Sequence, residues 1–84
     1  QWMAWQFDNP EQGEGLIQAF RRENCEDSVR TFKLSGLNSK AQYEVTNFDV
    51  EKKTIISGKE LMGDGLKVEI RTKPGAALIS YKQI

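Results

Sequence analysis

Residues 66–71 read Leu-Lys-Val-Glu-Ile-Arg, with an apolar side chain at every second position and a charged one between. Because successive side chains of a β-strand point to opposite faces, this period of two predicts a strand with one buried and one solvated face. The same alternation recurs along almost the whole chain, in short runs that end at Gly, Asn, Asp or Pro. No segment has the 3.6-residue period of a long amphipathic helix. The sequence therefore predicts an all-β protein.

The alternating runs predict about seven short antiparallel strands. Asp64-Gly65 is a strong hairpin signal, and Pro74-Gly75 is predicted to turn the chain into its last strand. Regularly spaced strands of this kind fit a small two-sheet β-sandwich, formed as one domain over residues 1–84 with helix content near zero. The predicted strands cover residues 2–7, 16–22, 29–34, 41–50, 54–57, 66–71 and 76–82.

Tyr43 is the most informative residue of the predicted core. Ala41, Tyr43 and Val45 alternate with Gln42, Glu44 and Thr46, a pattern of core-facing and solvent-facing residues that is predicted to continue toward Phe48 and Val50. Tyr43 also follows a Leu-Ser-Gly-Leu segment at the spacing of a tyrosine corner, in which the hydroxyl bonds to backbone a few residues upstream. We interpret it as a packing device.

The charge balance argues against several classes of partner. The sequence holds twelve basic and twelve acidic side chains and no histidine, so its net charge is zero. Without a long-range positive field, binding to nucleic acid or to an anionic membrane is not expected. Cys25 is the single cysteine, which excludes a disulfide within the chain and leaves the compartment undetermined.

The side chains needed for common catalytic and metal sites are also missing. The lack of histidine excludes Ser-His-Asp and Cys-His pairs and an ordinary zinc site. Asp8, Glu11 and Glu14 lie close in sequence, but Pro10 stands where a calcium loop needs an oxygen ligand, so we interpret them as a solvated turn. We predict no catalytic, cofactor-binding or metal-binding residue and no cofactor.

Trp2 and Trp5 are the candidate contact residues. An odd separation along one strand places the two indoles on opposite faces, so they cannot share one core and one of them must point outward. Met3 and Phe7 lie on the side of Trp5. The outward ring is interpreted as a contact with a neighbouring domain, because Trp is enriched at interfaces. Ordinary coverage of a sheet edge and stacking on a carbohydrate are the alternatives.

Several short segments together resemble the C-terminal β-sandwich of glycoside hydrolase family 36, the alpha-galactosidases. Each segment is largely strand and turn chemistry, and their order and spacing carry the resemblance over nearly the whole chain. The segments are WQFDNPE (5–11), GLIQAFRR (15–22), LSGL (34–37), AQYEV (41–45), SGKELM (57–62), GL (65–66) and ALISY (77–81).

This resemblance implies an accessory role. Enzymes of the family hydrolyse alpha-galactosides with retention, using two aspartates of a preceding (β/α)8 barrel, and neither aspartate is carried by this chain. The chain, which starts at Gln1 inside an apolar run, is interpreted as a C-terminal fragment of a larger glycosidase. It is expected to be non-catalytic and to cover part of the barrel in the same polypeptide. An independent carbohydrate-binding module and a fibronectin-type-III-like interaction domain are the alternative interpretations.

Overall fold

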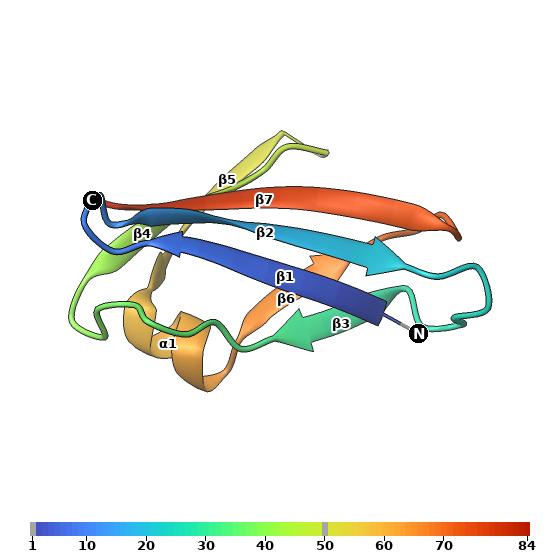
Figure 1. Cartoon of the computed structure of the whole chain (residues 1–84), viewed down its shortest axis with the longest axis horizontal. Helices are drawn as coiled ribbons and strands as arrows, with labels where there is room; N and C mark the ends of the chain where they lie inside the picture. Colours follow the sequence, from blue (N-terminus) through green and yellow to red (C-terminus); the bar gives the residue numbers. More distant parts are fainter. Residues whose placement is uncertain (1, 50) are drawn as a thin grey trace.

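The computed structural model describes residues 2–49 and 51–84, which form seven strands and one short helix (Figure 1). Five strands form the large sheet in the order β1-β2-β7-β4-β5, and β3 and β6 form a second, two-stranded sheet. All strand pairs are antiparallel, so the predicted all-β, two-sheet architecture is confirmed. The elements are β1 (Trp2–Asn9), β2 (Glu14–Arg21), β3 (Val29–Phe32), β4 (Gln42–Asn47), β5 (Lys52–Ser57), α1 (Gly58–Gly63), β6 (Leu66–Glu69) and β7 (Gly75–Gln83).

The small sheet and α1 cover one face of the large sheet, as Figure 1 shows, and the core lies between these layers. We call the covered face of the large sheet the inner face and the opposite one the outer face. Alternate residues of β2, β4 and β7 supply the inner side of the core, while β6, α1 and Leu34 supply the other side. The buried core residues are Ile17, Ala19, Leu34, Tyr43, Val45, Leu61, Leu66, Val68, Ile70, Ala77, Ile79 and Tyr81.

The predicted hairpin at Asp64-Gly65 is wrong. The segment before it forms α1, in which Leu61 is fully buried, and the Ser57 hydroxyl caps the helix by accepting from the Glu60 backbone N–H at 3.1 Å. The strand that follows pairs with β3, where Leu66 lies opposite Phe32. The helix therefore carries the chain from the large sheet to the small one, which a hairpin turn could not do.

Strand β4 ends earlier than the alternation predicted. The Asn47 side chain accepts from the Asp49 backbone N–H at 3.0 Å, and Asp49 in turn accepts from the Leu78 N–H at 3.0 Å. These two side-chain acceptors turn the backbone out of the strand, so the predicted continuation of the strand through Phe48 is wrong, and Phe48 is 53% exposed. Val50 lies outside the described residues.

The tyrosine corner is confirmed. The Tyr43 hydroxyl accepts a hydrogen bond of 2.9 Å from the Asn38 backbone N–H, five residues upstream. Its ring packs edge-on against Tyr81, with centroids 5.9 Å apart. The corner lies on the fourth strand, and the strands divide five and two. Because immunoglobulin-type sandwiches divide four and three and place the corner on the sixth strand, the strand order argues against the fibronectin-type-III-like interpretation.

A buried arginine fixes the loop after β2. Arg21 is 5% exposed and points to the inner face, where its guanidinium donates to the backbone carbonyls of Cys25, Glu26 and Ile70 at 2.8–3.1 Å. Backbone oxygens satisfy the buried donors without a carboxylate. One side chain thus holds the 22–28 loop against the end of β6.

Candidate domain interface

The outer face of the large sheet carries a row of large apolar side chains. Alternation along β1 and β2 sends one set of residues inward and the other set outward. The pairing register then brings the outward set together, because Met3 lies opposite Phe20 and Phe7 lies opposite Leu16. We call this set the outer patch; its members, which are 36–55% exposed, are Met3, Trp5, Phe7, Leu16, Phe20 and Leu78.

Trp5 occupies the centre of the β1 row of the outer patch. Its indole is 46% exposed and meets the ring of Phe20 edge-on, with centroids 5.6 Å apart and planes at 75°. Edge-to-face aromatic pairs are attractive beyond the area that they bury. The contact links the β1 row to Phe20 of β2 on the surface of the sheet.

Trp2 lies on the opposite face of the same strand, as the odd spacing predicted. It packs against the core beside Phe32, with ring centroids 5.9 Å apart, and its indole N–H donates to the Asp27 carbonyl at 2.9 Å. Trp2 therefore contacts the domain's own second layer. The structure does not bring the two predicted contact residues together, and only Trp5 belongs to the outer patch.

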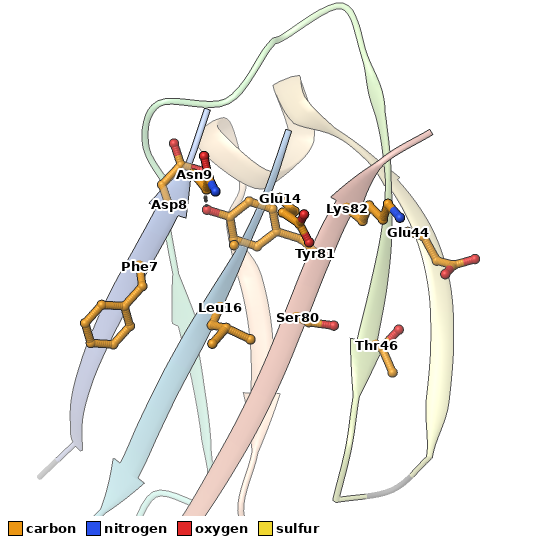
Figure 2. Close-up of a pocket in the computed structure, with 11 residues that line it drawn as sticks. Phe7, Asp8, Asn9, Glu14, Leu16, Glu44, Thr46, Ser80, Tyr81 and Lys82 are labelled. Carbon is orange, nitrogen blue, oxygen red and sulfur yellow. Dashed lines mark hydrogen bonds between the residues drawn. The ribbon is translucent and has the colours of Figure 1, made fainter. Parts of the chain in front are cut away.

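A shallow groove of about 490 Å³ crosses β1, β2, β7 and β4 at the end of the outer patch formed by Phe7 and Leu16 (Figure 2). Its floor is low because Ser80 and Thr46, which lie opposite each other on β7 and β4, have short side chains. Leu16 and Phe7 rise on the side of the outer patch. The other end is polar and is lined by Glu14, Lys82 and Glu44.

Tyr81 anchors the strands beneath this groove. It points inward and is 1% exposed, and its hydroxyl donates to Asp8 at 2.6 Å while accepting from the Gln6 side chain at 2.9 Å. Gln6 also donates to the Ser35 carbonyl at 2.9 Å, which ties β1 to the second layer. Burial raises the pKa of Tyr81 well above its usual value, and the hydrogen bond to Asp8 adds to this shift.

Gly15 makes room for the Tyr81 ring. The two residues are cross-strand neighbours, and a Cβ at Gly15 would collide with the hydroxyl and ring of Tyr81 and with the Phe7 carbonyl. Glycine inside a strand often marks such a close approach. The backbone under Phe7 and Leu16 is therefore fixed by a tightly packed aromatic ring.

The described residues hold no group of three or more His, Cys, Asp or Glu side chains placed to bind a metal ion. Of the acidic residues in the predicted solvated turn, Asp8 accepts a hydrogen bond from the Tyr81 hydroxyl, and Glu14 lines the groove. No helix in the described part of the chain is long and apolar enough to cross a membrane. The distinctive surface of this domain is therefore the outer patch with its neighbouring groove.

Comparison with protein families identifies the domain. The family model described as the glycosyl hydrolase family 36 C-terminal domain matches residues 2–80. The chain belongs to this family. The resemblance read from short sequence segments is thereby confirmed over residues 2–80 of the chain.

Solved structures place the same fold inside much longer chains. The galactosidase domain of the alpha-galactosidase-sucrose kinase AgaSK is similar at 21% identity with a TM-score of 0.76. The family 36 alpha-galactosidases AgaB and AgaA A355E D548N from Geobacillus stearothermophilus, the latter in complex with raffinose, are each 24% identical with a TM-score of 0.79. Each match covers 99% of this chain but 11% of the other. A search of the curated proteins found no match.

Half of the outer patch was missed from the sequence. Met3 and Phe7 were placed beside Trp5, but Leu16, Phe20 and Leu78 were not assigned to the same surface. The available signal was the turn after Asn9, because a tight antiparallel connection there sets Phe20 opposite Met3. The alternation of β2 could not show which face the second layer covers, because both faces of this strand carry apolar side chains.

Proposed function

We propose that this domain is the non-catalytic C-terminal domain of a glycoside hydrolase resembling the alpha-galactosidases, and that it packs on a preceding (β/α)8 catalytic barrel through the outer patch. The two catalytic aspartates of a retaining mechanism would then belong to the barrel. The observation that carries the proposal is the outer patch itself, a set of six exposed apolar side chains on three adjacent strands around Trp5 and the polar Gln18. Family membership and the length of the similar chains support it.

The composition of the outer patch fits an interface between domains. Trp, Phe and Met are enriched at protein interfaces, and the largest apolar patch on a protein surface is often a functional one. Each Å² of the exposed apolar surface of the outer patch that a neighbouring domain removes from water stabilises the contact by about 25 cal/mol before the costs of docking. The rigid support from Tyr81 and Gly15 limits the ordering cost of docking, because the strands that carry Phe7 and Leu16 are already held in place.

The test compares the outer patch with an apolar residue on the other sheet. In the whole polypeptide, Trp5→Ser is expected to lower the temperature of inactivation and to expose the domain junction to protease, while the kcat of the active fraction is retained. The matched control is Val29→Ser, which removes an apolar side chain of 36% exposure from β3. Equal effects of the two substitutions would contradict the proposal, and so would hydrolysis of an aryl alpha-galactoside by the isolated domain.

Carbohydrate binding is the second candidate function, favoured by the exposed Trp5 ring beside a groove with polar side chains. Indole rings stack on the apolar faces of sugars. The test is a titration of the isolated domain with galactose or raffinose while tryptophan fluorescence is recorded. A saturable change that Trp5→Phe abolishes would support this function, and no change at millimolar sugar would exclude it.

A further inference from the structure

The large sheet has two edge strands, β1 and β5, which differ in how they are covered (Figure 1). The β1 edge is tied to the second layer, because the side chains of Trp2 and Gln6 donate to the backbone carbonyls of Asp27 and Ser35 at 2.9 Å. Over residues 52–56 of β5, the described part of the chain contains no such side-chain hydrogen bond. The edges of β3 and β6 are only four residues long and offer few backbone groups. The open edge of the large sheet is therefore β5, and such edges are templates for pairing with another strand.

The ladder between β4 and β5 decides which backbone groups face the open edge. The Gly58 N–H donates to the Ala41 carbonyl at 2.9 Å, and these two residues are the next pair beyond the β4–β5 register. In an antiparallel ladder, hydrogen-bonded pairs alternate with pairs that are not hydrogen-bonded. The N–H and C=O groups of Lys53 and Ile55 therefore point away from β4, towards the open edge.

The side chains of β5 also suit a pairing strand. Ile55 lies opposite Glu44 of β4 on the outer face of the sheet and is 64% exposed. The strand reads Lys-Lys-Thr-Ile-Ile-Ser, rich in β-branched residues and without Pro or Gly. Its two lysines oppose pairing with a strand that places basic residues opposite them. Any partner strand must therefore bring uncharged or acidic side chains to Lys52 and Lys53.

A second copy of β5 meets this condition in an antiparallel register centred on Thr54. Each Thr54 then lies opposite Thr54 of the other copy, and each Lys53 lies opposite Ile55. Only groups that point outward are paired, so the backbones of Lys53 and Ile55 exchange two hydrogen bonds in each of the two symmetric pairs. On the outer face, Glu44, Ile55 and Lys53 of the second copy form one row across three strands. The lysine stem covers Ile55, and its ammonium group is directed towards the carboxylate.

We infer that two copies of this chain associate through β5, so that their five-stranded sheets continue into each other across a two-fold axis at Thr54. The net charge of zero leaves no long-range repulsion between the copies. Strand β4 separates β5 from β7, so this pairing leaves the outer patch uncovered. The inference is therefore independent of the proposed function and goes beyond it.

The first test is the oligomeric state of the 84-residue chain, measured by sedimentation equilibrium at increasing concentration. A monomer–dimer equilibrium is expected. Ile55→Pro removes an N–H that does not bond to β4, and proline is tolerated where the N–H of an edge strand faces solvent. It should raise the dissociation constant by about tenfold or more, because symmetry removes two hydrogen bonds from the dimer. Ile55→Thr is the control, since it keeps the N–H and the β-branch, and its dissociation constant should rise less.

The second test checks the register by crosslinking. In the chain with Thr54→Cys, the two thiols lie in a pair that is not hydrogen-bonded, where the Cα atoms are about 4.5 Å apart, within the range of a disulfide. Mild oxidation should therefore convert this variant to a covalent dimer. Lys52→Cys is the control, because its two copies are offset by four residues, or about 13 Å along the strands, and should not crosslink.

Several results would overturn the inference. The unchanged chain could stay monomeric at every concentration, or position 52 could crosslink as readily as position 54. A dimer that a folded Ile55→Pro variant still forms with unchanged affinity would place the contact on another surface. A dimer that Trp5→Ser dissociates and Ile55→Pro does not would assign self-association to the outer patch. If Ile55→Pro does not fold, as judged by thermal unfolding, the crosslinking pair decides alone.

Discussion

Leu78 and Ile79 are neighbours on β7 and have similar side chains, yet Leu78 is 36% exposed and Ile79 is 1% exposed. Ile79 lies on the inner face of the large sheet, which the small sheet and α1 cover. Leu78 lies on the outer face, which no described element covers. Both faces therefore carry large apolar side chains, but only the inner face buries them within the described residues. We propose that the outer set serves contact with a partner.

The largest expected effect comes from the inner face. Ile79→Ala should lower the free energy of unfolding by about 2–5 kcal/mol, because it removes buried methyl groups and leaves a cavity between the two layers. Urea denaturation of the 84-residue chain measures this loss. A loss below about 1 kcal/mol would mean that the two layers are not tightly packed, and the inner face would then not differ from the outer face in its contribution to stability.

The second prediction concerns the close approach under the outer patch. Gly15→Ala should destabilise the chain by about 1–3 kcal/mol, because the new methyl group overlaps Tyr81 and must push β2 and β7 apart. Gly63→Ala is the control, since a Cβ at this helical position meets no atom within 4 Å outside its chain neighbours and the backbone of its own helix. That substitution should be neutral or stabilising by up to about 1 kcal/mol. Thermal unfolding of both variants tests the pair.

The third prediction concerns the Tyr81 hydroxyl. Tyr81→Phe should cost about 1 kcal/mol at neutral pH through the hydrogen bonds lost to Asp8 and Gln6. Because the pKa of Tyr81 is raised in the folded state, folding favours the neutral phenol, and this part of the stability is complete below about pH 10 and is lost as the pH rises further. Denaturation at pH 8 and pH 11 should therefore show a smaller alkaline loss for the variant. An equal loss in both proteins would assign the alkaline effect to other groups.

The smallest effect is expected on the outer face. Leu78→Ala should change the free energy of unfolding of the 84-residue chain by less than about 0.5 kcal/mol, because the side chain has no covering layer to lose. The same substitution should weaken docking in the whole polypeptide. If Leu78→Ala lowers the free energy of unfolding of the isolated chain as much as Ile79→Ala does, then the outer face is part of the domain's own core. The proposed difference between the two faces would then be wrong.

Much of the fold follows from local chemistry that the sequence displays. Period-two alternation predicted the strands and placed Trp2 and Trp5 on opposite faces, and the spacing before Tyr43 predicted the tyrosine corner. The division into five and two strands depends on long-range pairing, above all on β7 inserting between β2 and β4, which no local pattern records.

The short helix was missed although one local signal was present. Ser57 followed three residues later by Glu60 is the first half of a capping box, and the Ser57 hydroxyl does cap α1. The Asp64-Gly65 pair was the stronger signal in the sequence, because hairpin turns favour it. The segment before it forms a helix instead, and this helix buries Leu61 in the core. Likewise, the strand was predicted to continue toward Phe48, yet the side chains of Asn47 and Asp49 ended it at Asn47.

The arginine held by three backbone carbonyls has a consequence for how this domain tolerates change. Since every residue supplies a carbonyl, the exposed side chains at 22–28 can be exchanged without removing these hydrogen bonds, whereas Cys25 is itself buried and the donor at Arg21 has no substitute of equal reach and geometry. A library that keeps Cys25 and randomises the exposed positions of that loop should remain folded, and lysine at position 21 should not rescue a chain that has lost the guanidinium.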